Sequence, residues 1–146
     1  MSTGTILDKI IARKQEEIAV GKNNYTLGEL EAMADNERKA RGFIASLFDR
    51  VRDHQPAVIA EIKRRSPGAG AICPDLDPLR LAPSYEAHGA SALSVLTDSE
   101  YFGGSLEDLQ VARGLVDIPI LRKDFIVDEA QIFEARMAGA DAILLI

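Results

Sequence analysis

The sequence predicts an α/β fold, a (β/α)8 barrel of the TIM type, with its first four strands present and an N-terminal helical extension. From Pro56 onward, short apolar strands alternate with capped helices, the pattern of parallel strands joined by crossover helices. The helix stop and strand of residues 89–96 recur at 139–146, as expected of repeated βα units. A barrel of this kind needs about 250 residues, and the chain has 146. We therefore expect the later strands to lie outside this sequence, and we assign residues 1–55 to the extension and 56–146 to the first half of the barrel.

The extension is predicted to hold three helices. Apolar residues at helical spacing run from Ile6 to Ile18, and Gly21 ends that helix. Thr26 and Glu29 form a capping box that opens a second, shorter helix. A third amphipathic stripe consists of Phe43, Ile44, Leu47, Phe48 and Val51. We expect the apolar positions of these helices to pack into the core.

Four barrel strands are predicted at residues 57–63, 92–96, 119–123 and 142–146. The first crossover helix opens at Asp77 and Pro78, an N-cap followed by the helical position that accepts proline. Pro83 either kinks this helix or delays its start to about Ser84, since proline removes a helical hydrogen bond. The other two crossover helices are bounded by Ser105 and Gly114 and by Asp128 and Gly139, with Gln131 at the capping-box position of the last.

Composition limits the functions open to the chain. Its hydrophobic content of 47% and charged content of 27% are ordinary for a soluble globular protein, and no apolar stretch approaches the roughly 20 residues of a membrane span. A net charge of −6 argues against a nucleic-acid surface. We see no secretion signal, and the single cysteine, Cys73, suits a reducing compartment. We expect a cytoplasmic protein with no nucleic-acid or membrane partner. Cys73 is a poor nucleophile because neither His54 nor His88 is placed beside it.

Charged residues at two strand ends are the candidates for chemistry. Glu61 and Lys63 stand two residues apart at the end of an apolar run, so both side chains point to the same face. Lys123 ends the third strand, and in a (β/α)8 barrel alternate strands fill the same interior layers. Lys63 and Lys123 can therefore meet, with Glu61 restraining its neighbour, an arrangement that would tune a lysine for proton donation. The alternative is a structural pair of Glu61 and Lys63, with Lys123 extending into water.

Three sequence motifs extend this interpretation. They are Ala60-Glu61-Ile62-Lys63-Arg64-Arg65-Ser66-Pro67, then Ser94-Val95-Leu96-Thr97-Asp98 with Tyr101-Phe102-Gly103-Gly104-Ser105, then Leu121-Arg122-Lys123-Asp124-Phe125-Ile126. In this order they closely resemble the indole-3-glycerol phosphate synthases of tryptophan biosynthesis. The resemblance runs over roughly residues 5–146 and covers the family's helical extension and its first four strands.

The resemblance implies a carboxy-lyase that closes the ring of 1-(2-carboxyphenylamino)-1-deoxyribulose 5-phosphate to indole-3-glycerol phosphate, with loss of carbon dioxide and water. It implies a phosphorylated small-molecule substrate and no metal or organic cofactor. By this resemblance Lys123 is the general acid, Lys63 holds the carboxylate side of the substrate, and Glu61 positions the lysines. Ser66 resembles a loop residue of the substrate pocket. The family's apolar wall against the aromatic ring is matched here by Phe102, Phe125 and Leu144. For these three residues, plain core packing is the alternative.

Parts of the family's site are expected to lie outside this sequence. The family's general base, a glutamate, and its main phosphate-binding segments belong to later strands and loops, so we expect the 146-residue chain alone to be inactive. Other phosphate-using (β/α)8 enzymes share the same order of elements, but the Glu61–Lys63 and Lys123–Phe125 motifs disfavour them.

Two alternatives of other classes stay open at this point. A non-enzymatic half barrel would complete itself by pairing its fourth strand with another copy, which makes self-association of the open half barrel one expectation. A nucleotide-binding doubly wound fold is weaker, because no Gly-x-Gly-x-x-Gly motif follows the first strand.

Overall fold

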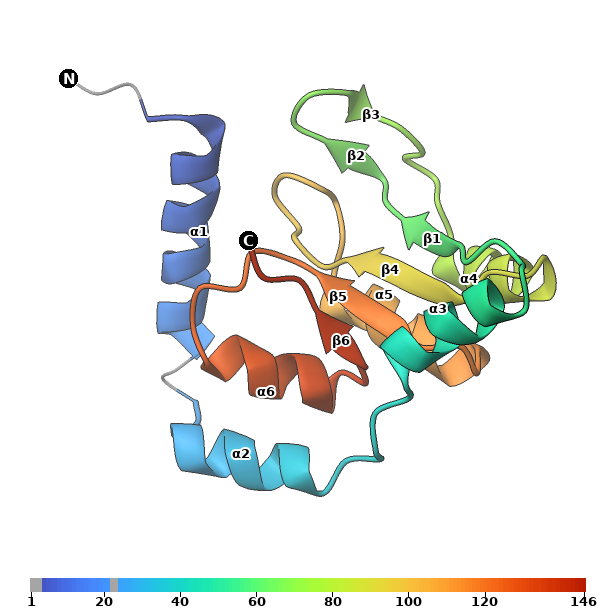
Figure 1. Cartoon of the computed structure of the whole chain (residues 1–146). Helices are drawn as coiled ribbons and strands as arrows, with labels where there is room; N and C mark the ends of the chain where they lie inside the picture. The colour runs from blue at the N-terminus through green and yellow to red at the C-terminus, as the bar shows by residue number, and fades with distance from the viewer. Residues whose placement is uncertain (1–3, 22–23) are drawn as a thin grey trace.

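The computed structural model describes residues 4–21 and 24–146, and its centre is a parallel sheet (Figure 1). The sheet strands are β1 (Ile59–Ile62), β4 (Ala92–Leu96), β5 (Ile120–Lys123) and β6 (Ala142–Ile143). They lie in the order β1-β4-β5-β6, so each strand pairs with the next one along the chain. Sequential parallel strands are the arrangement of a (β/α)8 barrel. In the described residues the sheet does not close, and β1 and β6 are its two edges. The α/β class is thus confirmed, and the structure is consistent with part of a barrel.

Three crossover helices cover one face of this sheet. They are α4 (Pro78–Ala87), α5 (Leu106–Leu115) and α6 (Ala130–Met137). Two of them begin at the predicted caps: Asp77 accepts a hydrogen bond from the Leu79 amide at 3.0 Å, and Ser105 accepts one from the Asp108 amide at 3.1 Å. The core lies between sheet and helices, and its larger buried members are Ile62, Leu93, Val95, Leu109, Val116 and Ile120.

Several predicted boundaries differ from the observed ones; β1, for example, spans Ile59–Ile62 instead of residues 57–63. Helix α4 starts at Pro78, after the predicted Asp77 cap, and continues through Pro83, so the alternative start near Ser84 is wrong. Ala82, next to this proline, is fully buried in the core. Helix α6 begins at Ala130, although Gln131 does accept hydrogen bonds from the preceding backbone. Strand β6 ends at Ile143 instead of residue 146, because its register with β5 stops there.

The extension forms the three predicted helices, α1 (Ile6–Gly21), α2 (Leu27–Asp35) and α3 (Phe43–Arg52). The capping box is present: Thr26 and Glu29 each accept a hydrogen bond from the other's backbone amide. Helix α2 packs along α6, and α1 stands beside the sheet (Figure 1). Helix α3 lies at the start of β4, where the Ser46 hydroxyl donates to the Ser91 carbonyl. None of the described helices combines the length and hydropathy needed to cross a bilayer.

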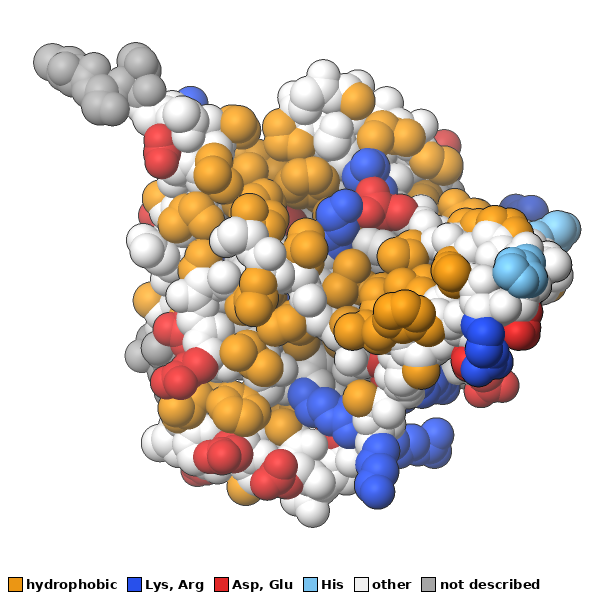
Figure 2. Space-filling view, viewed as in Figure 1, with side chains coloured by type: hydrophobic (Ala, Val, Ile, Leu, Met, Phe, Trp, Pro, Cys, Tyr) orange, Lys and Arg blue, Asp and Glu red, His pale blue; other side chains and the backbone are white. Residues whose placement is uncertain are grey.

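The expected core packing of the extension holds for only part of it. Ile10 is buried, but Ile44, Phe48 and Val51 on α3 are 66%, 67% and 59% exposed. Hydrophobic side chains gather over the side of the molecule on which α3 is seen (Figure 2). The prediction failed there because an amphipathic stripe fixes which face of a helix is apolar, whereas burial depends on what packs against that face.

Candidate active site

Glu61 is the centre of the candidate site. The Nζ atom of Lys123 lies 2.7 Å from its Oε2 atom, and the Nζ atom of Lys63 lies 2.9 Å from its Oε1 atom. The Ser94 hydroxyl also donates to Oε2, at 3.2 Å. The two amines therefore meet at one carboxylate, as the sequence predicted. The alternative in which Lys123 stands apart in water is wrong, because Lys123 makes the shorter of the two ion pairs.

Strand geometry places these side chains on one face. Along β5, Ile120 and Arg122 are buried on the helix-covered side, while Leu121 and Lys123 alternate onto the open side. Parallel pairing puts Glu61 opposite Ser94, and Ser94 opposite Leu121. Lys123 lies two residues beyond Leu121, at the end of β5 and on the same face. The charged groups thus gather where the strands end, the edge at which (β/α)8 enzymes carry their chemistry.

The electrostatics of this site favour an anion. Burial raises the pKa of Glu61, but hydrogen bonds from Lys123 and Lys63 outweigh it, and the resulting pKa lies below the ordinary value of 4.5. Two ammonium groups on one carboxylate leave a positive charge uncompensated. The Lys123, Lys63 and Glu61 side chains are 39%, 31% and 25% exposed, so solvent screens the pairs and they add little to stability. The same exposure leaves the amines accessible to a ligand.

An apolar wall stands beside Lys123. Phe102, Phe125 and Leu144 line a cavity of about 50 Å³ together with Lys123, and the two phenyl rings lie 6.2 Å apart at 40°. All three apolar residues are only partly buried, which argues against plain core packing. The cavity is far smaller than the roughly 300 to 1,000 Å³ of typical small-molecule sites. These residues therefore line one side of a small cavity and do not enclose a space of ligand size.

Ser66 follows Lys63 by three residues and lies in a separate element. It belongs to a short hairpin of β2 (Arg65–Ser66) and β3 (Gly70–Ala71), and its hydroxyl accepts a hydrogen bond from the Ala69 amide within that hairpin. Among the described residues, no hydrogen bond or ion pair joins Ser66 to Lys63, Lys123 or Glu61. The hairpin is joined to the loop after β4, since the Arg65 amide donates to the Phe102 carbonyl at 3.3 Å.

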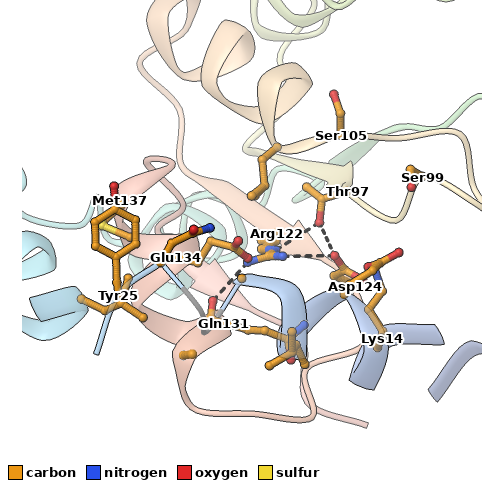
Figure 3. Close-up of a pocket in the computed structure, with 17 residues that line it drawn as sticks. Lys14, Tyr25, Thr97, Ser99, Ser105, Arg122, Asp124, Gln131, Glu134 and Met137 are labelled. Carbon is orange, nitrogen blue, oxygen red and sulfur yellow. Dashed lines mark hydrogen bonds and ion pairs between the residues drawn. The ribbon is translucent and has the colours of Figure 1, made fainter. Parts of the chain in front are cut away.

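A second, larger cavity of about 470 Å³ lies on the helix side of β5 (Figure 3). The Arg122 guanidinium donates there to Thr97, to Asp124 and to the Gln131 carbonyl at 3.1, 3.2 and 3.1 Å. By volume, this cavity is better suited to a small-molecule ligand than the cavity beside Lys123. Its charged groups, however, are already paired with one another, so we assign the candidate site to the side on which Lys123 lies.

Two parts of this arrangement were not predicted, although the sequence carries signals for both. Ser94 was detectable in principle, as a hydroxyl within the buried strand Ala92–Leu96 that the parallel register sets opposite Glu61. The internal pairing of Arg122 and Asp124 was detectable from strand alternation, which separates both of them from Lys123.

A sequential parallel sheet with charged and apolar side chains gathered at its strand ends is the arrangement expected of part of a (β/α)8 barrel. Comparison with known families then identifies the chain further. The family model of indole-3-glycerol phosphate synthase matches residues 7–146, and the chain belongs to that family. An indole-3-glycerol phosphate synthase of Dechloromonas aromatica (strain RCB) is 51% identical over 141 residues, which is 97% of this chain and 54% of that relative. The chain thus spans about half the length of the curated relative it matches, and the family resemblance of the sequence is confirmed.

Proposed function

We propose that the protein containing this chain is an indole-3-glycerol phosphate synthase. It would convert 1-(2-carboxyphenylamino)-1-deoxyribulose 5-phosphate to indole-3-glycerol phosphate, releasing carbon dioxide and water, without a metal or organic cofactor. The observation that carries the proposal is the contact of Lys63 and Lys123 with the two oxygens of Glu61, beside an apolar wall, in a chain of this family. Within it, residues 1–55 are the helical extension and 56–146 the first half of a closed eight-stranded barrel.

Lys123 is the general acid in this proposal. Bond formation between the aromatic carbon and the substrate carbonyl builds negative charge on the carbonyl oxygen, which an ammonium group stabilises and then protonates. The Lys123 side chain is 39% exposed, so it can reach a substrate, and its 2.7 Å contact with Glu61 fixes the position of the amine. Glu61 acts by positioning this amine and that of Lys63.

Lys63 and the apolar wall bind the two ends of the aromatic part of the substrate. The Lys63 ammonium pairs with the substrate carboxylate, while Phe102, Phe125 and Leu144 pack against the ring and exclude water from the intermediate. Ser66 contributes to the substrate pocket from the hairpin, which a backbone hydrogen bond links to Phe102. A substrate that carries carboxylate and phosphate groups suits lysines within an acidic chain, because charge focusing is local.

The same proposal places the enzyme in the cytoplasm. The enzyme binds a phosphorylated small molecule, and no nucleic acid or membrane is involved. The edges β1 and β6 carry unpaired backbone groups and allow association of two copies of the 146-residue chain, which gel filtration tests.

The decisive experiment compares two proteins. One is the 146-residue chain; the other, called here the completed chain, is the same chain followed by the C-terminal segment of the Dechloromonas aromatica relative that lies beyond their 141-residue match. We expect the completed chain to form indole-3-glycerol phosphate, followed by indole absorbance, and Lys123→Ala to abolish it. Lys9→Ala, on the exposed side of α1, is the matched control.

Two outcomes would contradict the proposal. A folded completed chain without turnover would refute the assigned reaction. Turnover by the 146-residue chain alone, abolished by Lys123→Ala, would refute the assignment of base and phosphate site to other segments.

A further inference from the structure

Lys14 is a buried cation that connects the extension to the barrel loops. It lies on α1 and is 3% exposed. Its Nζ atom is 3.1 Å from Oδ2 of Asp98, 3.1 Å from Oδ1 of Asp124 and 2.8 Å from Oε2 of Glu17. Asp98 follows β4 and Asp124 follows β5, so a single amine holds the two loops that leave neighbouring strands.

Each of these aspartates fixes the backbone of a residue of the apolar wall. Oδ1 of Asp98 accepts hydrogen bonds from the Tyr101 amide at 2.7 Å and the Phe102 amide at 3.2 Å. Oδ1 of Asp124 accepts one from the Phe125 amide at 2.8 Å. The aspartate side chains are 1% exposed, so the hydrogen bonds are shielded from water. Lys14 therefore controls two carboxylates that set where both phenyl rings stand.

The two aspartates depend on Lys14 to different degrees. Asp124 also accepts hydrogen bonds from the Thr97 hydroxyl at 2.6 Å and from the Arg122 guanidinium at 3.2 Å. Oδ2 of Asp98 has no hydrogen-bond donor among the described residues, and its ion pair with Lys14 is the contact that offsets its charge. Removing one partner of a buried ion pair leaves the other charge uncompensated, so loss of Lys14 would act first on the Asp98 turn.

We propose that Lys14 is a positioning residue for the aromatic wall of the active site, acting through Asp98 and Asp124 on Phe102 and Phe125. This rests on the proposed function in one respect, that the wall receives the aromatic ring of the substrate. The helical extension then takes part in substrate binding without touching the substrate. An alternative role, general attachment of α1, would affect the whole molecule and not these two loops in particular.

The first test is the steady-state kinetics of Lys14→Met in the completed chain. We expect KM to rise about tenfold while kcat changes less than about threefold, the pattern of lost binding rather than lost chemistry. Arg13→Met is the matched control: Arg13 is on the same helix and pairs with Glu100 of the same loop, but it is 44% exposed. Equal KM changes in the two variants, or a fall in kcat alone, would overturn the proposal.

The second test does not need catalysis. Amide hydrogen exchange in Lys14→Met is expected to be at least about tenfold faster at Tyr101, Phe102 and Phe125, with β4 unchanged. Unchanged exchange at these amides, or equal acceleration in β4, would overturn the role of Lys14 even if the parent proved inactive. An inactive parent would refute only the assigned reaction.

Asp98→Asn can be measured alone should Lys14→Met fail to fold, and the two variants together complete a double-mutant cycle. Asp98→Asn keeps an acceptor for the Tyr101 and Phe102 amides and removes the charge that Lys14 offsets. We expect the KM rise of the double variant to be smaller than the product of the two single effects, because the residues act on one another. Independent effects that multiply would contradict the proposal.

Discussion

Replacing Glu61 by glutamine separates the proposed role of this carboxylate in positioning the lysines from any role in stability. The amide keeps the size of the side chain but offers one acceptor where two amines now bind, at 2.7 and 2.9 Å. Its amino group then faces either Lys63 or Lys123 and cannot accept their hydrogen bonds. At least one lysine therefore loses its fixed position at the strand end.

The expected magnitudes differ between folding and catalysis. A hydrogen bond to a charged group is worth about 1.5 to 3 kcal/mol, but these side chains are 25% to 39% exposed. Solvent screening reduces the loss of stability to about 1 kcal/mol or less. At about 2 to 4 °C per kcal/mol, the melting temperature should fall by only a few degrees. General acid catalysis contributes about 10²- to 10⁴-fold, so a misplaced Lys123 should lower kcat by about a hundredfold.

The assay is turnover of the completed chain, with thermal unfolding of the same preparation. Because the folded pKa of Glu61 is lowered, its stabilising contribution is present above pH 4.5 and is lost as the pH falls through the folded value. The glutamine variant should lack this part of the acid dependence. Activity within about threefold of the parent would refute the positioning role, and a large loss of stability with normal kcat would refute the assignment of Glu61 to chemistry.

Three further predictions concern other residues. Asp141→Ala removes a fully buried acceptor of three hydrogen bonds and should lower the free energy of unfolding by about 3 kcal/mol, measured by urea denaturation, whereas the exposed Asp117→Ala should change it by less than about 0.5 kcal/mol. Gly104→Ala would place a Cβ atom against the Leu96 carbonyl oxygen and should destabilise by about 2 kcal/mol in the same assay; no measurable loss would contradict the packing. Lys123→Arg keeps the charge but replaces a point donor by a planar fork with a higher pKa, and should lower kcat at least about a hundredfold in the completed chain.

Local sequence signals predicted most of the fold. The helix caps at Thr26, Asp77 and Ser105 depend on only a few adjacent residues, and each accepts a hydrogen bond at the predicted place. The exposure of Phe48 and the early end of β6 were not predictable in this way, because they depend on which distant segments lie alongside. Capping is a local interaction, whereas burial and strand pairing are not.

The candidate site was predictable to the extent that it follows from strand alternation. Two-residue spacing places Glu61 and Lys63 on one face, and the parallel register brings Lys123 to them. Lys14 was not predictable, because a lysine on an amphipathic helix has the same local pattern whether it is solvated or buried. Its burial is decided by Asp98 and Asp124, which belong to the barrel strands far along the chain.

The segment Arg122-Lys123-Asp124 shows how one strand end serves both sides of the sheet. Alternation sends Lys123 to the open face, where Glu61 binds it, and sends Arg122 and Asp124 to the helix side. Asp124 is there bound by Lys14 of α1, so the residue next to the proposed acid is held by the extension. A change on the helix side of β5 therefore reaches Lys123 through a single peptide bond. This short path is why variants of Lys14 and Glu61 should affect one site from opposite faces of the sheet, the first mainly through KM and the second mainly through kcat.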